Sequence, residues 1–293
     1  MNNDQIIITV ASWEPRFWLG FERLVATRLP KEVYMYFYAE YSINTEPSRV
    51  KVREYCQSNS VVLHELRLSF SEPTNSCKTL YKSIGSADLA GKDLVLDITT
   101  MPRETIWILL SLIDGVGSST RWAYHRPERY NNDWLSRDPS QPRFVPKLGG
   151  VTKLGIPTKL LILSGFDVER TKQVITFYEP ELTLIGWQQG SQFNNQLMNV
   201  SKHEEEFKNC PDVNIFEINA YSSDHGYAEV ESQLKKHIQD SNVIMTSFGP
   251  KPSAIALYRL HKLYSQTSLA YAPSKEFNPD YSSGIGDSII ETL

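Results

Sequence analysis

The 293-residue sequence has few cysteines, and their spacing argues against two kinds of cysteine chemistry. Cys56, Cys77 and Cys210 lie far apart, so no pair forms a C-x-x-C motif, and an odd count does not suggest a disulfide framework. No two of the six histidines stand at metal-ligand spacing. We therefore expect reduced thiols in a cytoplasmic protein, with neither a metal site nor a cofactor.

An excess of positive charge and a long hydrophobic run are also missing. Thirty Lys and Arg stand against 34 Asp and Glu, which gives a net charge of −4. This balance argues against bulk binding of duplex nucleic acid but leaves room for a local basic pocket. Apolar stretches such as residues 106–113 are far shorter than the ~20 residues of a membrane span, and the N-terminus does not read as a signal peptide. We expect no membrane partner.

The chain lacks the short motifs of three common enzyme classes. It has no G-x-x-x-x-G-K-[ST] phosphate loop, no H-E-x-x-H and no G-x-S-x-G. No catalytic residue can be named on that basis, and we favour a binding protein over an enzyme. The sequence does have the length and the 41% hydrophobic content to form two domains with real cores.

Three segments of the first half recur in the same order in the second half. WAYHRPERYNNDWLS (122–136) aligns with LAYAPSKEFNPDYSS (269–283) at an offset of 147. TMPRETIWILLSLI (100–113) aligns with FGPKPSAIALYRLH (248–261), which pairs Pro102 with Pro250 and Arg103 with Lys251. IITVASWEPR (7–16) aligns with LLILSGFDVER (160–170). The common order predicts an internal duplication.

Each half alternates short apolar strands with amphipathic helices, which predicts βαβ units and a mostly parallel sheet covered on both faces. A cluster of Pro and Gly between the halves predicts an irregular connection. We therefore predict an α/β protein of two tandem, doubly wound, Rossmann-like domains. Their predicted bounds are 1–140 and 158–293, joined by a linker at 141–157.

Ligands of open parallel sheets bind at the carboxyl ends of the strands, where the strand order reverses. Hydroxyls, a cation and a helix N-terminus gather in the loops expected at that edge, and such a combination attracts phosphate. We predict that Arg103 and Lys251 contact phosphate and that Trp13 and Phe166 offer aromatic faces to a base. The predicted ligand-binding residues are Ser12, Trp13, Glu14, Asp97, Thr99, Thr100, Arg103, Ser164, Phe166, Lys251 and Ser253.

The same residues allow simpler interpretations. Thr100 and Ser253 could only cap helices, with Arg103 solvated. The recurring segments 124–136 and 271–286 could fold over the strand ends as lids, or be plain turns rich in Asn, Asp and Pro. His125 could be a general base or a structural histidine.

Residues 93–107, DLVLDITTMPRETIW, resemble a loop of CARF-like (CRISPR-associated Rossmann fold) nucleotide sensors. That loop reads Asp-x-Thr-Gly-Gly-Thr-Lys after a central strand. Asp97, Thr99 and Arg103 match its Asp, first Thr and Lys, whereas residues 100–102 replace the glycine pair and the second Thr. The resemblance implies a Rossmann-like sensor of cyclic oligonucleotides.

Three hypotheses for function follow. The first is a sensor of a nucleotide or other phosphorylated small molecule, with its pocket between or beneath the two halves, acting through a partner effector protein in a defence or signalling complex. The second is an enzyme acting on a nucleotide or sugar phosphate, with Glu14 or Asp97 as the acid or base. The third is a structural subunit of a larger complex.

Overall fold

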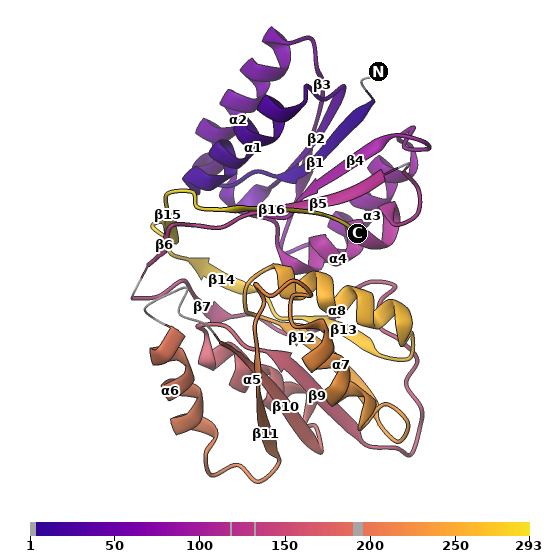
Figure 1. Cartoon of the computed structure of the whole chain (residues 1–293), viewed down its shortest axis with the longest axis vertical. Helices are drawn as coiled ribbons and strands as arrows, with labels where there is room; N and C mark the ends of the chain where they lie inside the picture. Colours follow the sequence, from indigo (N-terminus) through magenta and orange to yellow (C-terminus); the bar gives the residue numbers. More distant parts are fainter. Residues whose placement is uncertain (1–3, 118, 132, 190–195) are drawn as a thin grey trace. The chain divides into compact units, whose positions relative to one another are not determined.

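The computed structural model describes residues 4–117, 119–131, 133–189 and 196–293. The chain divides into two compact units: unit 1 is Met1–Asn131 with Pro279–Leu293, and unit 2 is Asn132–Asn278. Each unit contains a six-stranded, mostly parallel sheet with helices on both of its faces (Figure 1). The predicted α/β class with two Rossmann-like sheets is confirmed.

The sheet of unit 1 has the strand order β16-β5-β4-β1-β2-β3, in which only β16 is antiparallel to its neighbour. The strands in chain order are β1 (Gln5–Val10), β2 (Glu32–Tyr38), β3 (Val62–Leu68), β4 (Asp93–Asp97), β5 (Ser119–His125) and β16 (Ser288–Thr292). The helices are α1 (Pro15–Thr27), α2 (Ser42–Ser58) after a short 3₁₀ turn at Ala39–Tyr41, α3 (Pro73–Gly85) and α4 (Arg103–Ile113).

Alternation along the strands decides which helix each side chain meets. Ile7 and Val33 pack with Phe17 and Phe21 of α1 in a buried cluster on one face. On the other face the Tyr38 hydroxyl lies 2.7 Å from Oγ1 of Thr105 in α4. Both faces are therefore covered, as the continuous apolar strands predict.

Unit 2 has the same arrangement, with the strand order β11-β10-β9-β12-β13-β8 and only β8 antiparallel. Its strands are β8 (Arg143–Phe144), β9 (Thr158–Leu163), β10 (Leu182–Gln188), β11 (Val213–Ile218), β12 (Asn242–Ser247) and β13 (Ser268–Tyr271). Its helices are α5 (Val168–Tyr178), α6 (Gln196–Phe207), α7 (Tyr227–Lys235) and α8 (Pro252–Leu263). Helix α5 packs on one face of the sheet through Val174. Helices α7 and α8 contact each other and lie side by side (Figure 1).

The register relates the two sheets residue by residue. In unit 1, Leu96 of β4 stands opposite Ile8 and Trp122; in unit 2, Met245 of β12 stands opposite Leu161 and Leu269. The sequence alignment pairs these flanking residues in the same way. The helix that follows begins after Pro102 in unit 1 and after Lys251 in unit 2. The backbone is extended at Pro102 but already helical at Lys251, so these two helix starts are not equivalent and the pairing of Pro102 with Pro250 stays a prediction.

The unit boundaries differ from the predicted ones in two places. The predicted linker 141–157 belongs to unit 2 and contains β8, because Phe144 pairs with Ala270 of β13. The last fifteen residues belong to unit 1, because β16 forms the edge of its sheet beside β5. Proline and glycine in the linker gave a local signal for irregular chain, but the partner strand is far away in sequence and leaves no local signal.

The recurring segments 124–136 and 271–286 contribute to two short antiparallel ribbons; residue 132 lies outside the described residues. In unit 1, β6 (Arg129–Tyr130) pairs with β15 (Ser282–Ser283). In unit 2, β7 (Ser136–Pro139) pairs with β14 (Ser274–Phe277). The segments are thus ordered by backbone pairing and are more than turns. In the described residues no helix is both long and apolar enough to cross a bilayer.

Candidate functional site

In each unit the strand order reverses at the first strand. β1 lies between β2 and β4, and β9 lies between β10 and β12. The carboxyl ends of β1 and β4 therefore form the crevice where open α/β sheets bind ligands, and those of β9 and β12 do so in unit 2. The loops at these ends carry the residues predicted to bind a ligand.

The loop after β4 uses its polar groups to hold strand ends together. Asp97, which is buried, accepts hydrogen bonds from Oγ1 of Thr9 at 3.3 Å and from the Thr99 amide at 3.0 Å. The Thr99 hydroxyl accepts the amide of His125 at 3.0 Å. Oγ1 of Thr100 donates to the carbonyl of Val10 at 2.7 Å. These three predicted ligand contacts therefore have internal partners that join β1, β4 and β5.

The loop after β1 is also engaged. Oγ of Ser12 accepts the amide of Glu14 at 3.2 Å. Nε1 of Trp13 donates to the carbonyl of Pro279 at 3.1 Å, and its ring centre lies 5.1 Å from that of Tyr41. The indole of Trp13 is partly exposed.

Glu14 forms a buried ion pair that sequence analysis missed. Nε of Arg16 lies 2.8 Å from its carboxylate, and Ser282 of the β15 ribbon donates to the same oxygen. The guanidinium lies 5.9 Å from the ring centres of both Tyr124 and Tyr130. Burial alone would lower the pKa of Arg16, but the coulombic attraction of Glu14 and both phenols outweighs it and raises the pKa.

Unit 2 repeats this arrangement. Asp167, the residue before α5, accepts the Arg170 amide at 2.9 Å, and its other oxygen lies 3.5 Å from Nε of Arg170. The Arg170 guanidinium also donates to Ser136 and Ser274 of the β7–β14 ribbon and lies 5.2 Å from the ring centre of Phe248. In both units an acid and a buried arginine thus tie the ribbon to the loop after the first strand. The two aligned segments 7–16 and 160–170 end in Arg16 and Arg170, and this recurrence was the sequence signal for the buried arginines.

At the corresponding edge of unit 2, several buried polar atoms lack a hydrogen-bond partner among the described residues. Among the described residues, Nε2 of Gln188, Oγ1 of Thr246, Oγ of Ser247 and Oγ of Ser253 have no hydrogen-bond partner. Ser247 and Ser253 are both 0% exposed. Such orphaned groups are rare, because each costs about 1–3 kcal/mol when buried without a partner. Of these four, only Ser253 was predicted.

These groups lie where two glycine-containing loops approach each other. A Cβ on Gly249 would lie 2.7 Å from Nε2 of Gln188 and 2.7 Å from the carbonyl oxygen of Ser164. A Cβ on Gly165 would lie 2.2 Å from the carbonyl oxygen of Phe248. The amide of Gln188 is oriented by the Ala220 amide, which donates to its Oε1 at 3.1 Å. Its NH₂ group therefore stays directed at the loop after β12.

The other predicted residues of unit 2 differ in their exposure. Ser164 is buried, and its hydroxyl donates to the carbonyl of Gly186 at 3.3 Å. Phe166 and Lys251 are partly exposed. Lys251 is the residue that precedes α8, so its charge stands at the N-terminus of that helix.

Helices α4 and α8 both begin without a side-chain cap. Thr100 binds the β1 backbone instead of capping α4, and Ser253 has no partner in the described residues, so the capping interpretation is wrong for both. Asp167 does cap α5. Arg103 begins α4, and Lys251 precedes α8. A cation is unfavourable at the positive end of a helix dipole and is stabilised there by an anion.

His125 is fully buried at the end of β5. Its Nδ1 lies 2.7 Å from Oγ of Ser288 in β16, and a Cβ on Gly20 would lie 2.4 Å from its ring. Burial lowers its pKa, Asp97 opposes the shift, and Arg23 and Arg16 add to it. This packing is that of a structural histidine. No group of three or more His, Cys, Asp or Glu side chains suited to a metal occurs in the described part of the chain.

No protein-family model and no curated protein matches the sequence. Among solved structures, one described as "a Type III CRISPR defence DNA nuclease activated by cyclic oligoadenylate" matches over 87% of this chain with a TM-score of 0.56 and 9% identity. The chain spans 63% of that protein's length. A putative universal stress protein from Pseudomonas aeruginosa UCBPP-PA14 matches with a TM-score of 0.26 and 9% identity, covering 92% of both chains. The first likeness shows the Rossmann-like fold.

Proposed function

We propose that the protein is a sensor that binds a nucleotide or other phosphorylated small molecule at the carboxyl edge of its sheets. The observation that carries this proposal is the set of buried polar atoms in unit 2 that lack partners. The hydroxyls of Ser247 and Ser253 and the NH₂ group of Gln188 would donate to phosphate oxygens once the loops that bury them open to admit the ligand. The uncapped N-terminus of α8 and Lys251 supply positive potential at that edge.

The nuclease with the similar fold is described as activated by cyclic oligoadenylate. Together with the resemblance of residues 97–103 to the CARF-like loop, this makes a cyclic oligoadenylate the first ligand to test. We propose that signalling passes to a separate effector protein in a defence or signalling complex.

The enzyme hypothesis needs a carboxylate that can exchange protons with a substrate. Glu14 is held by Arg16 and Ser282, and Asp97 by Thr9 and the amide of Thr99. Both carboxylates are buried and serve internal bonds, which favours binding without turnover.

The test is a calorimetric titration with a cyclic oligoadenylate, AMP and inorganic phosphate. Arg103→Ala and Lys251→Ala should each weaken phosphate-ligand binding by about 1–3 kcal/mol, the scale of one charge-assisted hydrogen bond. Lys78→Ala, on the exposed side of α3, is the matched control and should leave the affinity unchanged. Equal affinities for wild type and both variants would overturn the anion site.

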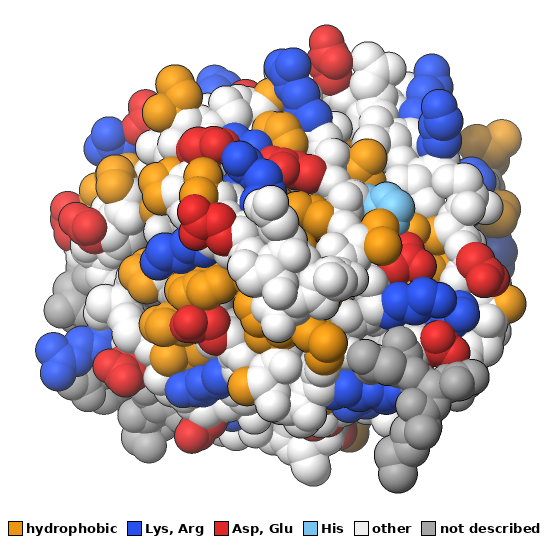
Figure 2. Space-filling view, turned by 90° about the horizontal axis from the view of Figure 1, so that it is seen from above, with side chains coloured by type: hydrophobic (Ala, Val, Ile, Leu, Met, Phe, Trp, Pro, Cys, Tyr) orange, Lys and Arg blue, Asp and Glu red, His pale blue; other side chains and the backbone are white. Residues whose placement is uncertain are grey.

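The mixed distribution of charge on the surface favours a small ligand over a nucleic-acid duplex. On the face shown in Figure 2, Lys and Arg side chains are interspersed with Asp and Glu. That face carries no extended basic stripe of the kind that follows a duplex backbone.

A further inference from the structure

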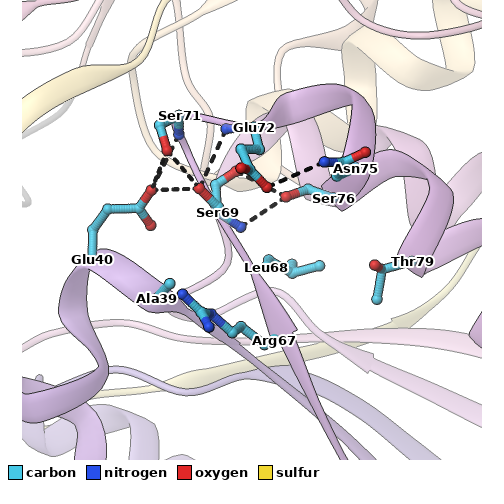
Figure 3. Close-up of a pocket in the computed structure, with 10 residues that line it drawn as sticks. All are labelled: Ala39, Glu40, Arg67, Leu68, Ser69, Ser71, Glu72, Asn75, Ser76 and Thr79. Atoms are coloured by element: carbon cyan, nitrogen blue, oxygen red, sulfur yellow. Dashed lines mark hydrogen bonds between the residues drawn. The ribbon is translucent and has the colours of Figure 1, made fainter.

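Unit 1 contains a second polar pocket, away from the loops after β1 and β4. It has a volume of about 630 Å³ and opens at the carboxyl ends of β2 and β3 and the start of α3 (Figure 3). This volume lies in the range of small-molecule sites. Its lining residues are Ala39, Glu40, Arg67, Leu68, Ser69, Ser71, Glu72, Asn75, Ser76 and Thr79.

The wall of the pocket is preformed by hydrogen bonds. Oε1 of Glu40 accepts the hydroxyls of Ser69 and Ser71 and the amide of Ser71, at 2.6–3.2 Å. Ser76 donates to the carbonyl of Ser69 at 2.8 Å and accepts its amide at 2.7 Å. The loop from β3 to α3 therefore keeps Glu40 in one orientation.

Aromatic stacking adds to this rigidity. The ring of Phe70, in the same loop, stacks on Tyr38 at 3.7 Å between centres. Phe70 also meets Tyr41 edge-on at 6.0 Å, and Tyr41 in turn contacts Trp13. An aromatic run thus extends from the loop after β1 to the pocket.

One oxygen of the Glu40 carboxylate binds the two serines, and in Figure 3 the other oxygen points away from both of them. A carboxylate has about four lone-pair positions, so it can accept a further donor. Partial burial would raise the pKa of Glu40, but the hydrogen bonds from Ser69 and from backbone amides lower it, so the group is a carboxylate at neutral pH. A carboxylate that only accepts suits a ligand that donates, and a pair of neighbouring hydroxyls is such a donor.

The charges in the lining narrow the ligand class. Two carboxylates, Glu40 and Glu72, face one guanidinium, Arg67, together with hydroxyls and the amide of Asn75. Arg67 is exposed and forms no ion pair with the described residues. A polyphosphate would meet more negative than positive charge here, whereas a neutral polyhydroxyl group would find both donors and acceptors.

We propose that this pocket binds a sugar with adjacent hydroxyls, which donate to Glu40 while Arg67 donates to a sugar oxygen. The site is separate from the anion site of unit 2 and does not depend on it. A free sugar and the ribose of a nucleoside share this chemistry, and the test separates them.

The experiment titrates the full chain with D-ribose, D-glucose, adenosine and 2′,3′-dideoxyadenosine, followed by ligand-observed NMR. We expect adenosine or a free sugar to bind, and dideoxyadenosine to bind at least tenfold more weakly than adenosine. If a free sugar binds with at least the affinity of adenosine, the pocket recognises sugars. If only adenosine binds, the pocket recognises nucleosides. No binding by any probe, or equal binding of adenosine and its dideoxy analogue, would overturn the proposal.

Two variants locate the site. Glu40→Gln can keep its carbonyl oxygen on the two serines and turn its NH₂ into the pocket, so an acceptor becomes a donor and affinity should fall at least tenfold. Arg67→Met should weaken binding by a similar factor. Glu54→Gln, an exposed glutamate of α2, is the matched control. Ser253→Ala should leave sugar binding intact, so failure here is distinguishable from failure of the anion site. Unchanged affinity in both Glu40→Gln and Arg67→Met would contradict the assignment.

Discussion

At the residue scale, the structure shows which predicted ligand-binding side chains already have hydrogen-bond partners within the protein. The sequence pattern found the loops, because hydroxyls and a cation beside a helix start are visible in one dimension. It could not show that Asp97, Thr99 and Thr100 bind one another's strands, since those bonds join residues about 25 to 90 positions apart. Nor could it show that the Ser247 hydroxyl and the Gln188 NH₂ group would be buried without a hydrogen-bond partner among the described residues.

The ion pair of Arg16 and Glu14 should be essential for stability. Arg16 is 2% exposed, so Arg16→Ala removes the guanidinium from a buried carboxylate that also accepts a hydrogen bond from Ser282. Breaking a buried pair by removing one partner typically costs about 3–5 kcal/mol. Denaturant unfolding should show that loss, and Lys78→Ala should stay within about 0.5 kcal/mol of wild type. A loss below about 1 kcal/mol for Arg16→Ala would show that the pair is dispensable.

His125 predicts how stability depends on pH. Its pKa in the folded protein is lowered by burial, so the unfolded chain takes up a proton first as the pH falls. The stabilising contribution of neutral His125 is present above the ordinary value of 6.5 and is lost as the pH falls below it. Its slope can reach about 1.4 kcal/mol per pH unit.

Unfolding measured from pH 7.5 to pH 5.5 should therefore be less pH-dependent in His125→Asn than in wild type. His261, another buried histidine with a lowered pKa, keeps part of the dependence in the variant. An identical slope in both proteins would mean that folding does not lower the pKa of His125.

At the scale of elements, the alternation of apolar strands and amphipathic helices predicted the parallel sheets but not where each helix begins. Helix α2 begins at Ser42, five residues before Pro47, although proline favours the first turn of a helix. Arg49 donates to the carbonyl of Ser42 at 2.9 Å and so ties the first turn of the helix to its third. Helix α7 begins only at Tyr227, because His225 and Gly226 both have positive φ angles.

Strand β16 should protect the backbone of β5 from hydrogen exchange and have no such effect on unit 2. It pairs with β5 along its whole length, and its Ser288 contacts His125 and Arg23. Deleting residues 288–293 exposes the backbone edge of β5. Hydrogen exchange of residues 121–125 should become markedly faster, while exchange in β13 of unit 2 serves as the internal control. Unchanged protection of β5 would show that β16 adds nothing to this sheet.

At the scale of the whole molecule, the two units share strand order, register and an acid–arginine pair tied to a ribbon, but they differ at the switch point. The hydroxyls of Thr99 and Thr100 in unit 1 bond its own strands, whereas those of Ser247 and Ser253 in unit 2 have no partner among the described residues. The shared register supports the predicted duplication, which stays a prediction. Groups that cost stability without a partner are typical of functional sites.

The most direct test of this account measures stability and binding together in the Ser247→Ala, Ser253→Ala double variant. Removing buried hydroxyls that have no partner should leave the free energy of unfolding unchanged or raise it. The same change should weaken the tightest-binding probe of the phosphate-ligand titration by at least tenfold, because two donors to phosphate are lost. A variant that unfolds more easily and binds as well as wild type would show that these serines are structural and would contradict the anion site.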